Sequence, residues 1–314
     1  MTLKKIMQNH KQITDKYVKR LQLENITIFL FHGVIKDNNF TIRNYTNKHI
    51  KYELFCNLLK ELNKVGNCIS MDQVLYHLET KEKPPKNSYV ITFDDGFDNN
   101  VTIAGPVLDD FKNKCIIYLT TNFIENNKMS WIDRIENIIE HNNDFVLKKS
   151  WLQKPLKISN KHDKINLLET IRSYVKNCNN INFDAFADDF CKNFQNNLIF
   201  DNDPIDKKLT WSQIKSLKDS EIFSFGGHSH NHPILSFLNK KELEFELDKS
   251  LELINTKGGF KTIHYSYPEG LSHCFNNKVI NELKYRGIKC CPTAIDGINS
   301  LETDPFYLKR VFVN

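Results

Sequence analysis

The chain has 314 residues, of which 40% are hydrophobic and 26% charged, and it carries a formal net charge of +5. These values indicate a soluble globular protein built as one large domain or as a domain with an insertion. A charge of +5 spread over this length is too small to indicate nucleic-acid binding, and no basic arm or nucleic-acid motif is present. None of the eight cysteines forms a C-x-x-C pair, so the pattern argues against a cysteine-based zinc site.

The first twenty residues are polar and charged, without the apolar core or the cleavage site of a secretory signal. No apolar run reaches the roughly 18 residues that a membrane-spanning helix needs. We therefore expect a cytoplasmic protein without a transmembrane segment, with a peripheral position at the inner membrane surface as the alternative. We also expect residues 1–24 to form a polar N-terminal segment and residues 25–314 a single domain.

In the first half of the chain, apolar runs alternate with helical patterns. Runs rich in β-branched and aromatic residues predict strands, and apolar residues at three- and four-residue spacing predict helices. We thus predict strands over residues 26–31, 89–94 and 115–120 and helices over residues 54–62, 71–78 and 106–112. From residue 135 to residue 208, Asn, Lys and Asp dominate and apolar residues recur at helical spacing. This stretch is expected to be a helical insertion that covers the site as a lid.

The alternation of strands and helices resumes after residue 208. Predicted strands cover residues 222–225, 263–267, 288–291 and 308–313, and predicted helices cover residues 240–255 and 275–286. Such alternation favours a parallel sheet covered by helices. Active sites of α/β barrels lie at the carboxyl ends of the strands. Because His32, Asp94, Asp95, His228 and Pro268 each follow a predicted strand, we expect the site at that edge of the sheet.

Two segments carry the chemistry. Residues 92–96 read Thr-Phe-Asp-Asp-Gly, so that two adjacent carboxylates and a glycine end an apolar strand. Residues 228–232 read His-Ser-His-Asn-His and offer two imidazoles four residues apart, which can reach one point from a single turn. One carboxylate and two histidines make a three-ligand metal site with open positions, and the second carboxylate is then free to act as a base. The two segments together predict a metal-assisted hydrolase.

At these residues the chain resembles the NodB-type polysaccharide deacetylases, a carbohydrate esterase family. Residues 92–96 match the family's first motif, T-F-D-D-G, and residues 228–232 match its second, H-[ST]-x-x-H. The similarity extends over residues 25–314 and is weakest at residues 135–208. The resemblance implies an α/β fold, a deformed and incomplete (β/α) barrel. It also implies that Asp95, His228 and His232 bind one divalent metal ion and that Asp94 is the general base.

Two departures from the family pattern have candidate substitutes elsewhere in the chain. Many members carry an arginine in the third motif that orients the base aspartate, whereas this chain has Tyr267-Pro268, and Arg310 is the candidate to replace it. Many members also carry a late histidine as general acid, and that motif is missing here. In a subgroup with permuted motif order, an apolar strand near the N-terminus ends in Tyr-His. Phe31-His32 resembles that version, which makes His32 the candidate acid. A backbone N–H near Tyr267 is expected to bind the oxyanion.

The sequence also gives expectations for three further residues and for the identity of the metal. For Trp131, stacking on a sugar and packing in the core are equally expected. His230 alternates away from its neighbours and is not expected to bind metal, and Glu269, in a Pro-Glu-Gly turn, is expected at the surface. Zinc is the expected ion, with cobalt, nickel and manganese as alternatives, because two histidines and one aspartate accept all four.

The leading hypothesis is a hydrolase that removes an N-acetyl group from an acetamido sugar. The substrate would be a cell-surface glycan or its nucleotide- or lipid-linked precursor. One alternative is a deformylase or another amide hydrolase acting on an amino sugar, and another is a non-catalytic glycan-binding module of the same fold. The stretch of residues 135–208 also offers a docking surface for glycan-assembly enzymes.

Overall fold

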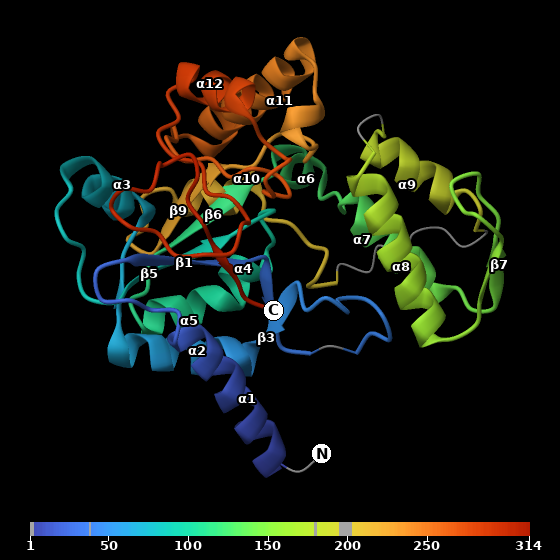
Figure 1. Ribbon diagram of the computed structural model, residues 1–314, viewed down its shortest axis with the longest axis horizontal. Coiled ribbons are helices and arrows are strands. Elements are labelled where there is room, and N and C mark those ends of the chain that lie inside the picture. Colours follow the sequence, from blue (N-terminus) through green and yellow to red (C-terminus); the bar gives the residue numbers. More distant parts are fainter. Residues whose placement is uncertain (1–2, 38, 179–180, 195–202) are drawn as a thin grey trace.

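A parallel β-sheet forms the centre of the molecule. The computed structural model describes residues 3–37, 39–178, 181–194 and 203–314 (Figure 1). Within these residues the main sheet has six strands in the order β10-β1-β5-β6-β9, with β4 paired to β5, and every pair is parallel. The strands are β1 (Ile26–Phe31), β4 (Asn67–Cys68), β5 (Ser88–Phe93), β6 (Cys115–Leu119), β9 (Phe223–Gly227) and β10 (Val311–Phe312). The predicted parallel sheet is therefore confirmed.

The part of the barrel between the edge strands β9 and β10 is irregular. Three backbone contacts carry it onward: the bridges Gly227–Tyr265 and His264–Cys290, and the hydrogen bond from Thr293 N to Leu308 O. The predicted strands over residues 263–267 and 288–291 thus contribute single bridges and no regular ladder. Pro268 and Pro292 end these two segments and have no N–H to donate, which limits further pairing. The result is the expected deformed, incomplete barrel.

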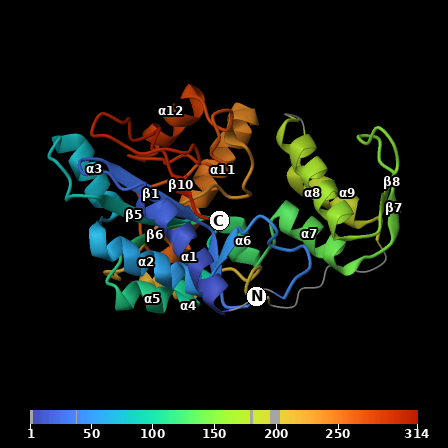
Figure 2. The ribbon, with the colours of Figure 1, turned by 60° about the horizontal axis from the view of Figure 1, so that its bottom comes forward.

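Helices cover both faces of the sheet (Figures 1 and 2). Those in the first 126 residues are α1 (Leu3–Val18), α2 (Tyr52–Val65), α3 (Met71–Thr80), α4 (Asn99–Thr102), α5 (Ala104–Asp110) and α6 (Thr121–Asn126). Those that follow residue 208 are α10 (Trp211–Leu217), α11 (Lys240–Leu253) and α12 (Asn277–Tyr285), with a 3-10 turn at Leu235–Phe237 and a π turn at Ile254–Gly258. Within the described residues, no helix has both the length and the apolar character that crossing a bilayer requires.

The stretch of residues 135–208 lies beside the sheet, at the right of Figure 1. The helix α7 (Trp131–His141) begins just before this stretch and leads into it. The described part then contains α8 (Lys161–Lys176), α9 (Phe183–Cys191) and a hairpin of β7 (Phe145–Leu147) and β8 (Leu156–Ile158) that the sequence pattern did not predict. Buried residues of these elements, among them Ile135, Leu168 and Phe190, pack into a cluster of their own. A second small pair, β2 (Gly33–Ile35) and β3 (His49–Lys51), follows β1.

Strand register brings the site segments together. In the β1–β5 pair Phe31 is level with Phe93, so that His32 and Asp94 leave adjacent strands side by side. In the β6–β9 pair Leu119 is level with Gly227, which places His228 just beyond the same edge. Because carboxyl ends of parallel strands meet at one edge, residues far apart in sequence converge there.

Candidate active site

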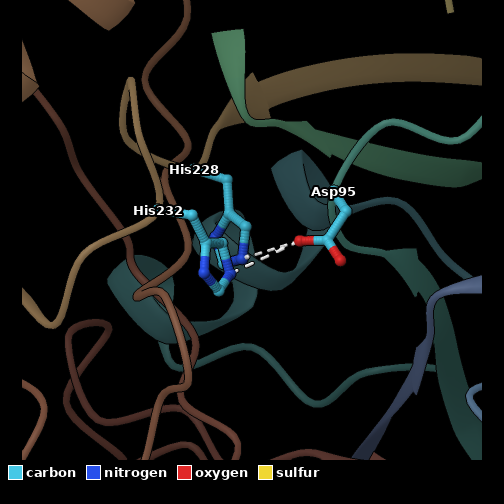
Figure 3. A group of neighbouring side chains, drawn as sticks. All are labelled: Asp95, His228 and His232. Atoms are coloured by element: carbon cyan, nitrogen blue, oxygen red, sulfur yellow. Dashed lines mark ion pairs between the residues drawn. The ribbon is translucent and has the colours of Figure 1, made fainter. Parts of the chain in front are cut away.

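Asp95, His228 and His232 form a compact group of possible metal ligands. One ligand atom from each lies within 4.8 Å of the others. Oδ1 of Asp95 is 3.4 Å from Nε2 of His232 and 3.7 Å from Nε2 of His228 (Figure 3). This oxygen is buried and has no hydrogen-bond partner among the described residues. A buried carboxylate oxygen left without a partner and facing two imidazoles fits a divalent cation.

The tautomer of His228 also fits a metal ligand. Its Nδ1 lies 2.8 Å from the carbonyl oxygen of Ser266, so Nδ1 carries the proton and Nε2 presents its lone pair. The close approach that permits this contact depends on glycine. A Cβ at Gly227 would stand 2.3 Å from the ring of Tyr265, and a Cβ at Gly226 would stand 2.6 Å from the ring of Tyr118. The Gly-Gly pair before His228 therefore lets β9 approach its neighbours.

Asp95 has an uncommon backbone conformation and pairs with a lysine that the sequence analysis did not single out. Its φ angle is +72°, in the left-handed region that non-glycine residues seldom adopt, which is a feature of functional sites. Nζ of Lys48 lies 3.0 Å from Oδ2 of Asp95 and 3.5 Å from Oδ2 of Asp133. Burial alone would raise the pKa of Asp95, but Lys48 and the site histidines hold that pKa well below its usual value. The carboxylate is therefore ionised and available to a cation.

Asp94 is bound by Arg310 through two parallel hydrogen bonds. Nη1 of Arg310 donates to Oδ1 at 2.9 Å and Nη2 donates to Oδ2 at 2.8 Å. The guanidinium is fully buried, and it also donates to Thr293 O and to Oγ of Ser266. Burial by itself would raise the pKa of Asp94, but Arg310 and His228 outweigh it and leave that pKa lowered. The candidate substitute for the missing third-motif arginine thus contacts the candidate base.

His32 lies in the same pocket as these groups. Its Nδ1 is buried without a hydrogen-bond partner among the described residues, and its ring packs edge-on against Phe312 at 5.6 Å. Burial holds the pKa of His32 down at about 4, although the carboxylates of Asp95 and Asp94 oppose this. The resting imidazole is therefore neutral at neutral pH. Any proton that it delivers must reach it during the reaction.

The pocket has a volume of about 350 Å³, within the range of small-molecule sites. Its lining includes every candidate of the Asp–His–His group, the candidate base and acid, and three cationic side chains. The lining residues are Leu30, His32, Thr46, Lys48, Asp94, Asp95, Ser130, Trp131, Ile132, Arg172, Lys176, His228, His232, Glu269, Leu271, Ala294 and Phe312. Arg172 and Lys176 come from α8, so the stretch of residues 135–208 contributes to the pocket wall.

Two expectations about the pocket wall are changed by the structure. Glu269 faces the pocket instead of the surface, because Lys176 of α8 binds its carboxylate at 2.5 Å and the side chain is only 16% exposed. The φ angle of Glu269 is +60°, which directs the residue inward from the turn. Trp131 both lines the pocket and packs against Phe183, with ring centroids 5.3 Å apart. Trp131 therefore has a core position and also lines the pocket, and its stacking on a sugar stays a prediction.

Tyr267 and His230 point away from the ligand group. The ring of Tyr267 is fully buried and stacks on Phe275 at 4.2 Å, and its hydroxyl donates to Phe306 O at 3.1 Å. Its backbone N–H is directed at Pro292 O, 3.5 Å away, and so lends no support to the expected oxyanion contact. Nδ1 of His230 lies 2.9 Å from Oγ1 of Thr121, and its exclusion from the metal site stays a prediction.

Comparison with known proteins gives the class of this site and fold. The family model described as polysaccharide deacetylase matches residues 81–291, well over half of the 314 residues. Among solved structures, the deacetylase PplD from Streptococcus pyogenes, in complex with acetate, has 17% identity and a TM-score of 0.60, with 93% of each chain covered. IcaB from Ammonifex degensii has 14% identity and a TM-score of 0.58, with 94% of each chain covered.

A third similar structure is the BpsB deacetylase domain from Bordetella bronchiseptica, at 15% identity and a TM-score of 0.55, covering 92% of this chain and 96% of that one. Likeness at such low identity shows a common fold. Comparison with curated proteins gave no match. The fold and the motif residues are those of a hydrolase that deacetylates carbohydrates. By its family match, the chain belongs to the polysaccharide deacetylase family.

Proposed function

We propose that this protein is a metal-dependent N-deacetylase of an acetamido sugar that belongs to a cell-surface glycan or to its nucleotide- or lipid-linked precursor. The observation that carries the proposal is the meeting of two groups in one pocket. Asp95, His228 and His232 offer converging ligand atoms, and Asp94 stands beside them with Arg310 on both of its carboxylate oxygens. A three-ligand group with an adjacent oriented carboxylate is an arrangement suited to amide hydrolysis by an activated water.

The residues have distinct roles in this proposal. Asp95, His228 and His232 would hold a divalent metal, with zinc favoured, which when bound supplies an acidified water and polarises the amide carbonyl. Asp94 accepts the proton of the attacking water. Because the pKa of Asp94 is lowered, this carboxylate stays ionised and ready as an acceptor at neutral pH. Arg310 keeps both oxygens of Asp94 in place.

His32 is the proposed proton donor to the departing amine. An amide nitrogen leaves poorly unless it is protonated, and His32 lines the same pocket as Asp94. Since the imidazole is neutral at rest, the proton that Asp94 takes from the water would have to pass to His32 before His32 gives it to the amine. Trp131, with its ring against Phe183, offers an apolar wall for one face of the sugar. Cytoplasmic location and docking to glycan-assembly enzymes stay predictions from the sequence.

Metal content and released acid together test the proposal. Elemental analysis would compare the parent protein with His228→Ala, and N-acetylglucosamine oligomers would then be assayed for released acetate. We expect about one equivalent of metal in the parent, little in the variant, and acetate from the parent only. Formate from an N-formyl amino sugar, with no acetate, would favour the deformylase. A parent protein that takes up no metal even after reconstitution would overturn the hydrolase and favour a glycan-binding module.

A further inference from the structure

A buried carboxylate of α11 contacts the loop that carries the two histidines of the metal site. Glu246 is only 5% exposed, yet it belongs to a surface helix and is absent from both sequence motifs. Its Oε2 accepts the backbone N–H of His230 at 2.9 Å and that of Asn231 at 2.8 Å. Its Oε1 accepts from Nδ2 of Asn231 at 2.7 Å. All three hydrogen bonds reach the loop between His228 and His232.

This loop needs external support because its backbone is strained. Ser229 and His232 have φ angles of +63° and +62°, in the left-handed region that non-glycine residues seldom adopt. Such conformations persist only when the surroundings determine them. The turn also directs successive backbone N–H groups to one side, and this makes a concave site for an anion. The carboxylate of Glu246 fills that site and so stabilises the turn that returns His232 toward His228.

The same helix holds the loop at a second point. Oγ of Ser250, one turn after Glu246, lies 2.9 Å from the hydroxyl of Tyr265, and that hydroxyl accepts the backbone N–H of Ser229 at 2.8 Å. On the opposite side, Oδ1 of Asn231 accepts from Nδ2 of Asn122 at 2.7 Å. The loop is therefore held between α11 and α6, and Glu246 supplies the only carboxyl group in these contacts among the described residues.

We propose that Glu246 is a positioning residue of the metal centre, which fixes the backbone of residues 229–231 so that His232 converges with His228 and Asp95. The inference rests on the proposed function, because it assumes that these three residues bind a metal ion. Glu246 does not touch the ligand atoms and acts through the loop. A carboxylate suits this role since both of its oxygens accept, whereas an amide accepts on one atom only.

The test is a titration of metal-free protein with Co²⁺, followed by its visible absorption, in the parent, Glu246→Ala and Glu246→Gln. We expect Glu246→Ala to bind Co²⁺ about 10- to 100-fold more weakly, the range typical for partners that orient metal ligands. Its absorption bands should also shift, because the geometry of His232 is relaxed. Glu246→Gln keeps one accepting oxygen and should lie between the parent and Glu246→Ala.

Glu244→Gln is the matched control. Glu244 is on the same helix, its side chain is 38% exposed, and its carboxylate pairs with Lys240 at 3.7 Å. Parental Co²⁺ affinity in Glu246→Ala, or an equal loss in Glu244→Gln, would overturn the inference. If circular dichroism shows that Glu246→Ala does not fold, Glu246→Gln decides, and parental affinity in that variant overturns the inference. A parent protein that binds no Co²⁺ would instead overturn the metal site itself, and this proposal with it.

Discussion

Arg310 and Asp94 are 216 positions apart in the chain and form a two-pronged ion pair in the buried interior, with N–O distances of 2.9 and 2.8 Å. Two parallel hydrogen bonds fix the plane of the carboxylate as well as its charge. Arg310 immediately precedes β10, whose pairing with β1 brings the end of the chain to the site. The last strand thus completes a site whose acidic residues follow β5.

Replacing Arg310 by Met should destabilise the fold strongly. The side chain of Asp94 is 5% exposed and would be left as a buried charge without its partner. Removal of one member of a buried ion pair typically costs about 3–5 kcal/mol in free energy of unfolding. Denaturant unfolding of Arg310→Met measures this cost. The double variant Asp94→Asn/Arg310→Met should recover a large part of it, and a double variant no more stable than Arg310→Met would contradict the explanation by an unpaired charge.

Substitution of the two adjacent aspartates should separate turnover from metal binding. Asp94→Asn is expected to keep the metal and to lose about 10²- to 10⁴-fold in rate, because the proton acceptor is lost while the three proposed ligands are unchanged. Asp95→Asn should lose the metal, since it removes the charged ligand that faces both histidines. Metal analysis and acetate release in the two variants, each checked for folding, provide the measurement. Loss of metal from a folded Asp94→Asn would show that the roles of the two aspartates are reversed.

The sequence could indicate those site residues that lie within short, recognisable motifs. Asp94, Asp95, His228 and His232 stand at strand ends in recognisable spacing, and parallel register explains why they meet. Lys48 has no such signal, since it comes from a loop before β3 and reaches Asp95 only through the tertiary fold.

Some secondary-structure elements differ from their predictions because tertiary contacts decide their form. Residues 263–267 and 288–291 have the composition of strands, yet they form single bridges because prolines follow both segments. Residues 1–24, which the sequence predicts to be a polar segment, contain the helix α1. Tyr17 of that helix packs edge-on against Phe29 of the sheet, with ring centroids 6.4 Å apart. The apolar residues of this helix recur at helical spacing, but they are few among polar and charged residues.

A buried histidine away from the pocket should make stability depend on pH. Nε2 of His264 lies 2.7 Å from Oδ1 of Asp72, and Nδ1 lies 3.0 Å from Sγ of Cys290. Burial alone would lower the pKa of His264, but Cys290 and Asp72 raise it to about 10. Its contribution is therefore complete below the unfolded pKa of about 6.5 and is lost as the pH rises toward the folded value.

Asp72 determines how the stability from the same interaction falls at low pH. Its hydrogen bond with His264 lowers the pKa of Asp72, so this contribution is lost as the pH falls below the unfolded pKa of about 4. The Tm difference between the parent and Asp72→Asn should thus be largest between about pH 4 and 6.5 and should shrink toward pH 10. Asp219→Asn, at a carboxylate that is 88% exposed, is the control. A Tm difference that does not change over this range would refute the assignment.

The role of His32 can be isolated by varying the leaving group. In His32→Gln we expect parental metal content and a rate of acetate release from an N-acetyl sugar that is about 10²- to 10⁴-fold lower. Hydrolysis of 4-nitrophenyl acetate should fall far less, because a nitrophenolate departs without being protonated. His273→Gln, outside the pocket, should leave both rates at the parental level.

Equal losses on the amide and the ester would show that His32 acts by orienting its surroundings and does not donate the proton. The resting pKa of His32 is about 4, so at neutral pH the imidazole is neutral before the reaction and must gain the proton that it donates. A larger loss on the amide than on the ester therefore reports on proton donation to the leaving group.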